Sequence, residues 1–557
     1  MFLPVTKEEM NKLGWDKADI ILISGDTYID SPFIGIAVIG NLLASKGFKV
    51  AVIAQPDINN DDIARLGEPA LYWGVTAGSM DSFVANYTAL NKFRNDDDLT
   101  PGGINNRRPD RACMVYTNLI RKHFKNTKPI ILGGVEASLR RIVHYDFKDN
   151  ALRRSILFDA KADMISYGMG ERTMLELAET LKNAKEWRDI KGLCYISKEK
   201  KENSLELPSF EECRDNKDKF FEMFSSFYKN SCAQREKTIS QKHAERYLIH
   251  NPKQPPLTTE ELDAVYGLDY TREVHPFYAK AGKVNAQETI KFSITTHRGC
   301  VGECNFCSIA VHQGKEIVSR SEKSILEEAE KITKLKDFKG YITDLGGPTA
   351  NMFAVKCRIN GNAGNCESKR CLFPKQCENL IFGHNKQTEI LKKAGMLEGV
   401  KKVFISSGIR YDMICNDTEN GQRYLDNIVE NHTSGQMKIA PEHCDDTVLF
   451  LMGKPSAKQL GKFIEMFKKS NKKNNFLTYY FIAAYPGCGE KEMKNLKSYI
   501  GRNLKIHPEQ VQIFTPTPST NATMMYYCEK DLSGNKIFVE KDRNNKQRQK
   551  RVITDGR

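Results

Sequence analysis

Long hydrophobic runs are absent from this sequence of 557 residues. No stretch approaches the roughly 18 consecutive apolar residues that a membrane-spanning helix needs. The beginning, Met-Phe-Leu-Pro-Val-Thr-Lys-Glu-Glu, lacks the apolar segment of a secretory signal. We therefore expect a cytoplasmic protein that does not contact membranes. The 40% hydrophobic content is ample for the cores of two or three domains.

A disulfide framework is also not expected, although the chain has 15 cysteines. Disulfide-rich folds are short and secreted, whereas this chain is long, rich in lysine and without a secretory signal. We expect its thiols to stay reduced and some of them to bind metal.

The charge is unbalanced, because 84 basic residues against 70 acidic ones give a formal net charge of +14. Such an excess makes nucleic acid a candidate partner. Part of it lies between Lys541 and Arg551, where six of eleven residues are Lys or Arg. This tail has no interleaved aromatic residues for base stacking. We favour a solvated basic helix or a frayed end, so nucleic acid is only weakly supported as a partner.

Three cysteines lie close together in the run His-Arg-Gly-Cys-Val-Gly-Glu-Cys-Asn-Phe-Cys, as Cys300, Cys304 and Cys307. A random placement of the cysteines would produce this spacing roughly 0.01 times. Three such thiolates bind three corners of a four-iron cluster, and no fourth cysteine follows at the spacing of a closed cluster. One iron then stays open to a substrate or cofactor, which favours chemistry over electron storage.

Zinc is the alternative for this motif. Cys300, Cys304 and Cys307 together with His297 or His312 would complete a tetrahedral site of mixed sulfur and nitrogen ligands. A structural zinc site usually contains a second closely spaced Cys or His pair, and none lies nearby. The spacing therefore favours the iron–sulfur cluster.

The motif resembles that of the radical S-adenosylmethionine (SAM) superfamily, and the chain is most similar to its YgiQ-type proteins. The resemblance covers nearly the whole sequence. It rests on segments with a distinctive order of residues, which are 133–138, 166–171, 308–321, 344–352, 406–412, 438–443 and 514–518.

This resemblance implies that the three cysteines hold a [4Fe-4S] cluster whose open iron binds SAM. An external donor such as flavodoxin or ferredoxin would reduce the cluster. Cleavage of the carbon–sulfur bond would then give methionine and a 5′-deoxyadenosyl radical that abstracts hydrogen from a substrate. Neither the substrate nor further catalytic residues are indicated by the sequence.

Several residues match cofactor-binding positions of the superfamily. Gly346 and Gly347 lack side chains, so their backbone could approach the methionyl amino group, although Pro348 stands where many members carry Glu. A plain strand-to-helix turn is the alternative.

Phe306 resembles the aromatic residue that shields the cluster and contacts adenine, with simple local packing as the alternative. Ser407 and Arg410 stand where the superfamily contacts the ribose and the methionyl carboxylate. Glu442 and His443 could bind the ribose or carry protons, and an ion pair at the barrel rim is the alternative for either.

The first part of the chain alternates strand and helix patterns. Apolar strand-like runs at 18–24 and 48–54 flank a helix-like run at 34–45, which predicts a Rossmann-like parallel sheet over residues 1–195. The order resembles the cobalamin-binding domains that precede many radical SAM barrels. Those that ligate cobalt carry a histidine after the first strand, where this chain has Asp26 to Ser31 without one. We therefore do not expect bound cobalamin.

Residues 196–285 lose this alternation and are highly charged, so we expect a helical connector there. The alternation returns over 286–535, which predicts a partial (β/α)6 barrel, before a basic tail at 536–557. The expected strands are 290–295, 340–344, 400–406, 436–439, 476–484 and 510–514, each but the last followed by a helix. In parallel barrels, chemistry gathers at the carboxyl ends of such strands.

A second cysteine group interrupts the barrel pattern within an expected insertion at 353–380. Its members are Cys357, Cys366, Cys371 and Cys377. This segment is too polar to form a core, so four thiolates holding zinc or a second iron–sulfur cluster would stabilise it. Incidental thiols or a redox pair are the alternatives.

Two other functions compete with the radical SAM reaction of unassigned substrate. The leading domain, the second cysteine group and the basic tail are also compatible with a radical methyl- or methylthio-transferase that acts on RNA or protein. The third hypothesis is a non-enzymatic iron–sulfur or zinc-binding module, which would bind metal without turning over a cofactor.

Overall fold

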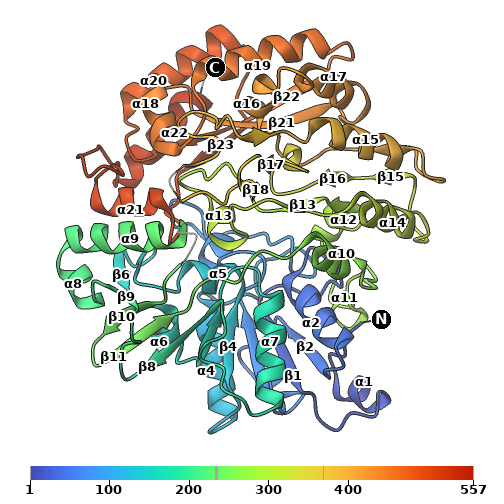
Figure 1. Ribbon diagram of the computed structural model, residues 1–557, viewed down its shortest axis with the longest axis vertical. Coiled ribbons are helices and arrows are strands. Elements are labelled where there is room, and N and C mark those ends of the chain that lie inside the picture. Colours follow the sequence, from blue (N-terminus) through green and yellow to red (C-terminus); the bar gives the residue numbers. More distant parts are fainter. Residues whose placement is uncertain (1, 233–235, 368, 556–557) are drawn as a thin grey trace. The chain divides into compact units, whose positions relative to one another are not determined.

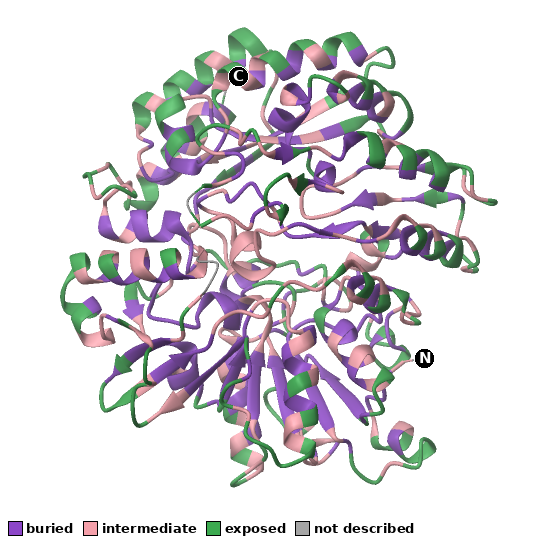
Figure 2. Ribbon diagram, in the orientation of Figure 1, coloured by how far each residue is buried: buried purple, intermediate pink, exposed green. Residues whose placement is uncertain are grey.

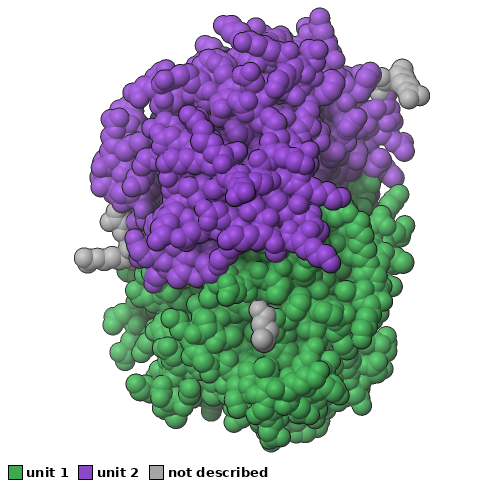
Figure 3. Space-filling model, turned by 90° about the vertical axis from the view of Figure 1, so that its right-hand side faces the viewer, with its two compact units in different colours: residues 1–255, 268–291 green, residues 256–267, 292–557 purple. Residues whose placement is uncertain are grey.

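The computed structural model describes residues 2–232, 236–367 and 369–555. It consists of two compact units (Figure 3). Unit 1 contains residues 1–255 and 268–291, and unit 2 contains residues 256–267 and 292–557. Among the helices formed by the described residues, none combines the length and the apolar character needed to cross a bilayer.

Unit 1 is built on a nine-stranded sheet (Figure 1). Its strands, in spatial order, are β2 (Val50–Ala54), β1 (Ile20–Ser24), β3 (Tyr72–Thr76), β4 (Ile130–Gly133), β7 (Met164–Ser166), β8 (Leu193–Ser197), β11 (Arg246–His250), β10 (Ile239–His243) and β9 (Leu205–Leu207). The first five run parallel. β1 and β2 are buried along their full length (Figure 2), which explains their uninterrupted apolar sequences. The Rossmann-like prediction is confirmed.

The remaining elements of unit 1 are short helices and one hairpin. The hairpin pairs β5 (His144–Asp146) with β6 (Ala151–Arg153). The helices are α1 (Lys7–Lys12), α2 (Gly35–Ser45), η1 (Asp62–Ala64), α3 (Ser82–Asn86), α4 (Ala112–His123), α5 (Gly134–Leu139), α6 (Ile156–Ala160), α7 (Glu171–Lys182), α8 (Phe210–Asp215), α9 (Lys217–Cys232), α11 (Pro276–Ala279) and α12 (Ala286–Ile290).

The segment 196–285 differs from the expected helical connector. It contains β9, β10 and β11, which extend the sheet of unit 1 beyond β8. β11 pairs antiparallel with both β8 and β10. These strands are only three to five residues long, so the high charge of their surroundings hid their alternation. A short piece of the same segment, α10 (Thr259–Gly267), belongs to unit 2.

Unit 2 contains the six predicted strand regions, and neighbours in chain order run parallel. An isolated parallel bridge from Ile409 to Ile439 links the third region to the fourth. The partial barrel is therefore confirmed. Its strands are β12 (Ser293–Thr295), β15 (Tyr341–Ile342), β16 (Asp344–Gly346), β20 (Lys402–Val403), β21 (Gln436–Glu442), β22 (Phe476–Ala483) and β23 (Gln510–Ile513).

Helices and one hairpin accompany these strands. The hairpin pairs β13 (His297–Arg298) with β14 (Val318–Ser319). The helices are α13 (Ser308–His312), α14 (Glu322–Thr333), η2 (Ala350–Met352), α15 (His384–Gly395), α16 (Tyr411–Asn416), α17 (Gly421–Asn431), α18 (Asp446–Met452), α19 (Ala457–Ser470), α20 (Glu490–Tyr499), η3 (Ile500–Leu504), α21 (Asn521–Cys528) and α22 (Arg543–Thr554).

Two details of the barrel differ from the expectation. The first strand begins at Ser293 rather than at residue 290, because Ile290 closes α12. The last strand is also followed by a helix, α21, whose first turn is capped by the hydroxyl of Thr520. The second cysteine group lies between β16 and α15, around a small sheet of β17 (Lys356–Cys357), β18 (Gly361–Asn362) and β19 (Leu380–Ile381).

The basic tail is a folded helix rather than a frayed end. α22 contacts α20 and β23, and its Lys546, Gln549 and Ile553 are buried. Gln549 Oε1 accepts a hydrogen bond from the backbone N–H of Ala484 at 3.0 Å. Lys546 donates through Nζ to the hydroxyl of Tyr526 at 2.8 Å. One face of the helix therefore stabilises unit 2.

Gly299 lies at the start of the three-cysteine loop, in a conformation that favours glycine. Gly299 follows β13 with a φ of +84°, and a Cβ there would lie 1.9 Å from the carbonyl oxygen of Glu316. Gly314 has a similar φ of +89° but open space around it. Substituting alanine at Gly314 should therefore cost only the strain of the left-handed backbone, whereas the same change at Gly299 should add the clash with Glu316.

We expect Gly299→Ala to lower the free energy of unfolding by about 2–4 kcal/mol, because a clash with backbone adds to the backbone strain. Gly314→Ala should cost about 1–2 kcal/mol through strain alone. Urea unfolding followed by circular dichroism measures both variants. Equal effects would show that the close approach to Glu316 is not a constraint.

Candidate functional site

The three predicted cluster cysteines lie on one tight loop between β13 and α13. Cys307 caps α13, and its backbone N–H donates to the carbonyl of Cys304 at 3.0 Å. Burial and the neighbouring Cys304 raise the pKa of the Cys300 thiol. The same two causes, in the same order, raise the pKa of Cys307 to about 12. These partly buried sulfurs would therefore become thiolates only with a cation to stabilise them.

Arg410 supplies a permanent positive charge beside this loop. It caps the start of α16, and its side chain is 6% exposed. Nη1 donates to Cys304 Sγ at 3.4 Å, and Nε donates to Asp412 Oδ1 at 2.7 Å. Burial opposes the charge, but Asp412 and Cys304 outweigh it and raise the pKa of Arg410. Nη2 is buried and has no hydrogen-bond partner among the described residues.

Asn351 and Thr349 were not predicted as site residues, yet they hold this arrangement together. Asn351 Oδ1 accepts from the backbone N–H of Arg410 at 2.8 Å, and its Nδ2 donates to the carbonyl of Arg410 at 3.0 Å. Thr349 Oγ1 lies 3.4 Å from Cys300 Sγ. Both belong to the segment 344–352 that carries the family resemblance, so the motif itself was the available signal.

The two glycines at the end of β16 are packed against side chains of unit 2. A Cβ on Gly347 would lie 2.4 Å from the ring of His297, so this glycine makes room for the imidazole. A Cβ on Gly346 would lie 2.9 Å from Ser407 Oγ. The carbonyl of Gly346 already accepts two hydrogen bonds from Thr296, at 2.7 Å from N and 2.9 Å from Oγ1. These contacts give both glycines a structural role.

Ser407 is tied to a carboxylate that was not predicted as a site residue. Its hydroxyl donates to Asp344 Oδ2, and its backbone N–H donates to Oδ1 at 3.2 Å. Ser406 donates a further backbone hydrogen bond to Asp344 at 2.8 Å. Burial raises the pKa of Asp344 in spite of these donors. The pair joins the ends of the second and third strand regions.

Glu442 ends β21 in an unusual backbone conformation. Its φ is +67°, which non-glycine residues adopt rarely, and the pairing of β21 with β22 shifts register just before it. The carboxylate lies 3.9 Å from Lys454 Nζ. Burial raises the pKa of Glu442, and Lys454 and Arg410 partly offset this increase. Strained, buried carboxylates of this kind are common at functional sites.

Phe306 and His443 occupy different surroundings. Phe306 is half-buried, and its ring meets the ring of Tyr485 edge to face at 6.1 Å. His443 is fully buried, with Nδ1 accepting from the backbone N–H of Asp445 at 3.0 Å and Nε2 3.6 Å from Cys488 Sγ. Burial lowers the pKa of His443 to about 4. His443 is thus a neutral core residue and is poorly suited to carrying protons.

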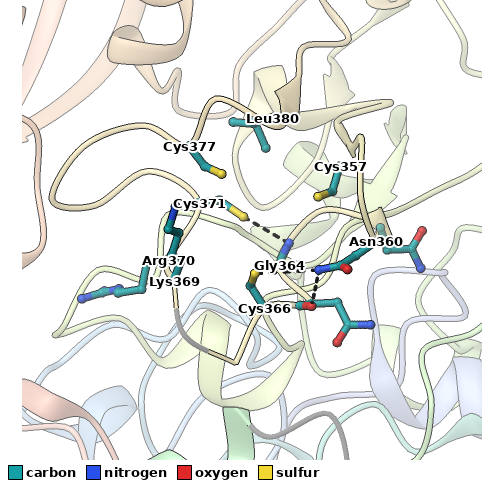
Figure 4. Close-up of a pocket in the computed structure, with 11 residues that line it drawn as sticks. Cys357, Asn360, Gly364, Cys366, Lys369, Arg370, Cys371, Cys377 and Leu380 are labelled. Carbon is teal, nitrogen blue, oxygen red and sulfur yellow. Dashed lines mark hydrogen bonds between the residues drawn. The ribbon is translucent and has the colours of Figure 1, made fainter.

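The second cysteine group also comes together in space. All four thiols line one hollow (Figure 4). Among the described residues, no group of three or more Cys, His, Asp or Glu side chains is gathered closely enough to hold a metal ion. Metal binding by either cysteine set therefore stays a prediction.

Buried ion pairs lie at the carboxyl ends of the parallel strands in unit 1. They were not predicted from the sequence. Arg108 pairs with Asp97 at 3.1 Å and also with Asp26, and both carboxylates are almost fully buried. Arg140 pairs with Asp81 and with Asp146, each at 2.8 Å. The first loop, where cobalt-ligating domains carry histidine, is thus occupied by a salt bridge of Asp26. The absence of cobalamin stays a prediction.

Two family models match the chain. One described as "Radical SAM N-terminal" matches residues 2–293, and one described as "Radical SAM superfamily" matches residues 294–500. A UPF0313 protein of Fusobacterium nucleatum subsp. nucleatum is 54% identical over 562 residues, covering 100% of this chain and 99% of the relative. A UPF0313 protein of Thermotoga maritima is 46% identical over 555 residues, covering 97% of this chain and 96% of the relative. These matches confirm the resemblance found in the sequence.

Among solved structures, the chain is similar to the radical S-adenosylmethionine methyltransferase TsrM from Kitasatospora setae, determined with cobalamin and a [4Fe-4S] cluster bound. The TM-score is 0.52 at 12% identity, with 92% of this chain and 78% of the other covered. At this identity the likeness shows a shared fold alone.

The buried His443 predicts a pH dependence of stability. Its folded pKa of about 4 lies below the ordinary value of 6.5, so its contribution is complete above pH 6.5 and is lost as the pH falls toward 4. Between pH 7.5 and pH 5 this loss is about 2 kcal/mol. His443→Gln should remove that part of the pH dependence in urea unfolding. The matched control is His507→Gln at an exposed position, and identical pH profiles for the two variants would contradict the assignment.

Proposed function

This chain belongs to the UPF0313 family and is a radical SAM enzyme, and we propose that Cys300, Cys304 and Cys307 bind three irons of its [4Fe-4S] cluster. The residues fit this group. Three thiols share one short loop, two of them have raised pKa values, and Arg410 donates to the third. When bound, the cluster supplies the electron that breaks a carbon–sulfur bond of SAM to give methionine and a 5′-deoxyadenosyl radical.

The strongest support comes from Arg410 Nη2, which is buried and has no hydrogen-bond partner among the described residues. A buried guanidinium nitrogen without a partner is costly, because its desolvation is not compensated by a hydrogen bond. A carboxylate accepts a short, charge-assisted hydrogen bond from a guanidinium nitrogen. We assign Arg410 Nη2, next to the cluster loop, to the methionyl carboxylate of SAM.

Other residues of unit 2 complete the proposed cofactor site. Ser407 and Glu442 follow neighbouring strands and are assigned to the ribose hydroxyls. Because the carbonyl of Gly346 is used by Thr296, we assign the amino group of SAM to the backbone around Gly347. Phe306, supported by Tyr485, is assigned to cover the cluster and limit the access of water. The proposed electron donor is an external protein such as flavodoxin or ferredoxin.

We expect Cys300→Ala to abolish reductive cleavage of SAM, because a cluster held by two cysteines is not retained. The assay measures 5′-deoxyadenosine and methionine formed by the anaerobically reconstituted full chain with dithionite as reductant. Wild type should form both products. The control, Cys232→Ser in unit 1, should behave as wild type.

If Cys300→Ala forms 5′-deoxyadenosine at the wild-type rate, the three-cysteine assignment is wrong. If the folded wild type binds zinc and no iron after anaerobic reconstitution, the proposal of a radical reaction fails as well.

We expect Arg410→Lys to weaken SAM binding about 10- to 100-fold, since lysine keeps the charge but loses the hydrogen bond from Nη2 to the carboxylate, which is worth about 1.5–3 kcal/mol. Equilibrium dialysis of labelled SAM against the reconstituted protein measures the dissociation constant. The cluster content should stay near that of wild type.

Arg423→Lys is the matched control, because Arg423 is exposed on α17. Unchanged affinity in Arg410→Lys would contradict the carboxylate assignment. A SAM analogue without the carboxylate should bind Arg410→Lys about as well as it binds wild type, and this result would support the assignment.

A further inference from the structure

Four thiols line one hollow in the insertion between β16 and α15. They are those of Cys357, Cys366, Cys371 and Cys377, and Figure 4 shows their sulfur atoms turned toward the same space. Each is a free thiol. Cys371 is buried and the other three are half-buried. They come from different turns of the segment, so local sequence spacing alone does not explain why they converge.

The hollow places hydrogen-bond donors and cations near the sulfur atoms, although burial raises the pKa of the Cys371 thiol to about 11. The backbone N–H of Gly364 donates to Cys371 Sγ at 3.3 Å, and Asn360 Nδ2 lies 3.8 Å from Cys366 Sγ. Lys369 and Arg370 also line the hollow, and no carboxylate does among the described lining residues. Donors and cations of this kind stabilise thiolates, as they do around metal-bound cysteines.

The insertion has little regular secondary structure and only a small apolar core to stabilise it. Its strands β17, β18 and β19 are two residues long. Its buried apolar groups form only a small cluster, which includes Cys371 itself beside Leu372 and Leu380. A segment with so few regular hydrogen bonds and so small a core usually needs a cross-link or a metal to fold.

We propose that Cys357, Cys366, Cys371 and Cys377 together ligate a second metal centre through four thiolates. The metal is one that prefers sulfur, supplied either as zinc or as an iron–sulfur cluster. Each thiol loses its proton to solvent when the metal binds, and no residue is oxidised. None of its ligands belongs to the Cys300 loop, so the two centres can be removed and counted separately.

The second centre would also support the loop that carries the first. Arg370, next to Cys371 in the chain, donates through Nη1 to Asn305 Oδ1 at 3.1 Å, and Asn305 follows Cys304. The backbone N–H of Ile317 donates to the carbonyl of Ala363 at 3.1 Å. A metal that fixes the insertion therefore also fixes two contacts to the neighbourhood of the Cys300 loop.

The first experiment removes the other centre. The full-length variant Cys300→Ala/Cys304→Ala/Cys307→Ala is reconstituted anaerobically with iron and sulfide, or with zinc alone, and its metal and acid-labile sulfide are counted. We expect it to retain either about four irons with sulfide or about one zinc per chain. If the folded variant retains neither, the second centre does not exist.

The second experiment removes the proposed ligands in the wild-type background. Cys357→Ser/Cys377→Ser should lose one centre per chain and keep the other, whereas Cys232→Ser should lose nothing. Unchanged metal content in the double variant overturns the proposal. Loss of SAM cleavage in the triple variant, with its metal retained, tests the proposed function separately.

A third measurement avoids variants that fail to fold. Metal-loaded wild type is alkylated with iodoacetamide, and labelling is located by mass spectrometry before and after chelation. Cys357, Cys366 and Cys377 should be protected at least tenfold relative to half-buried Cys232 and should become reactive when the metal is removed. Labelling equal to that of Cys232, or protection that only a disulfide reductant relieves, overturns the proposal.

Discussion

The buried guanidinium of Arg410 is the charge on which the arrangement of unit 2 depends. A buried cation needs hydrogen-bond acceptors and negative charge nearby to offset its loss of hydration. Asp412 and the thiol of Cys304 take two of its donors, and Asn351 holds its backbone on both sides. The third loop of the barrel is thus bound to the second and to the cluster loop. The one open nitrogen gives the site its proposed ligand.

The parallel barrel explains why these residues meet. Parallel strands bring the residues at their carboxyl ends to the same edge, so Ser407 meets Asp344 although the two are far apart in the chain. Most of this could be predicted from the sequence, because apolar runs followed by glycine or proline motifs recur six times. The three-cysteine loop could also be predicted, since its spacing is rare by chance.

Other parts could not be predicted, for physical reasons. The strands β9, β10 and β11 are short and lie in charged sequence, so their period was hidden. Asn351 and Thr349 lie in the recognisable motif at 344–352, but their hydrogen-bond partners Arg410 and Cys300 are distant in the chain, so the motif did not indicate their role. The use of the Gly346 carbonyl by Thr296 is also a tertiary contact. Buried ion pairs such as Arg108 with Asp26 are likewise formed by distant segments.

We propose that SAM binds beside Arg410 to the open iron of a cluster held by Cys300, Cys304 and Cys307. Electron paramagnetic resonance of the Cys357→Ser/Cys377→Ser protein, reduced anaerobically with and without SAM, measures whether SAM reaches this iron. We predict a reduced cluster signal that shifts on addition of SAM and that broadens further with SAM labelled with ¹⁷O in its carboxylate. A reduced cluster whose signal is unchanged by SAM would contradict the account.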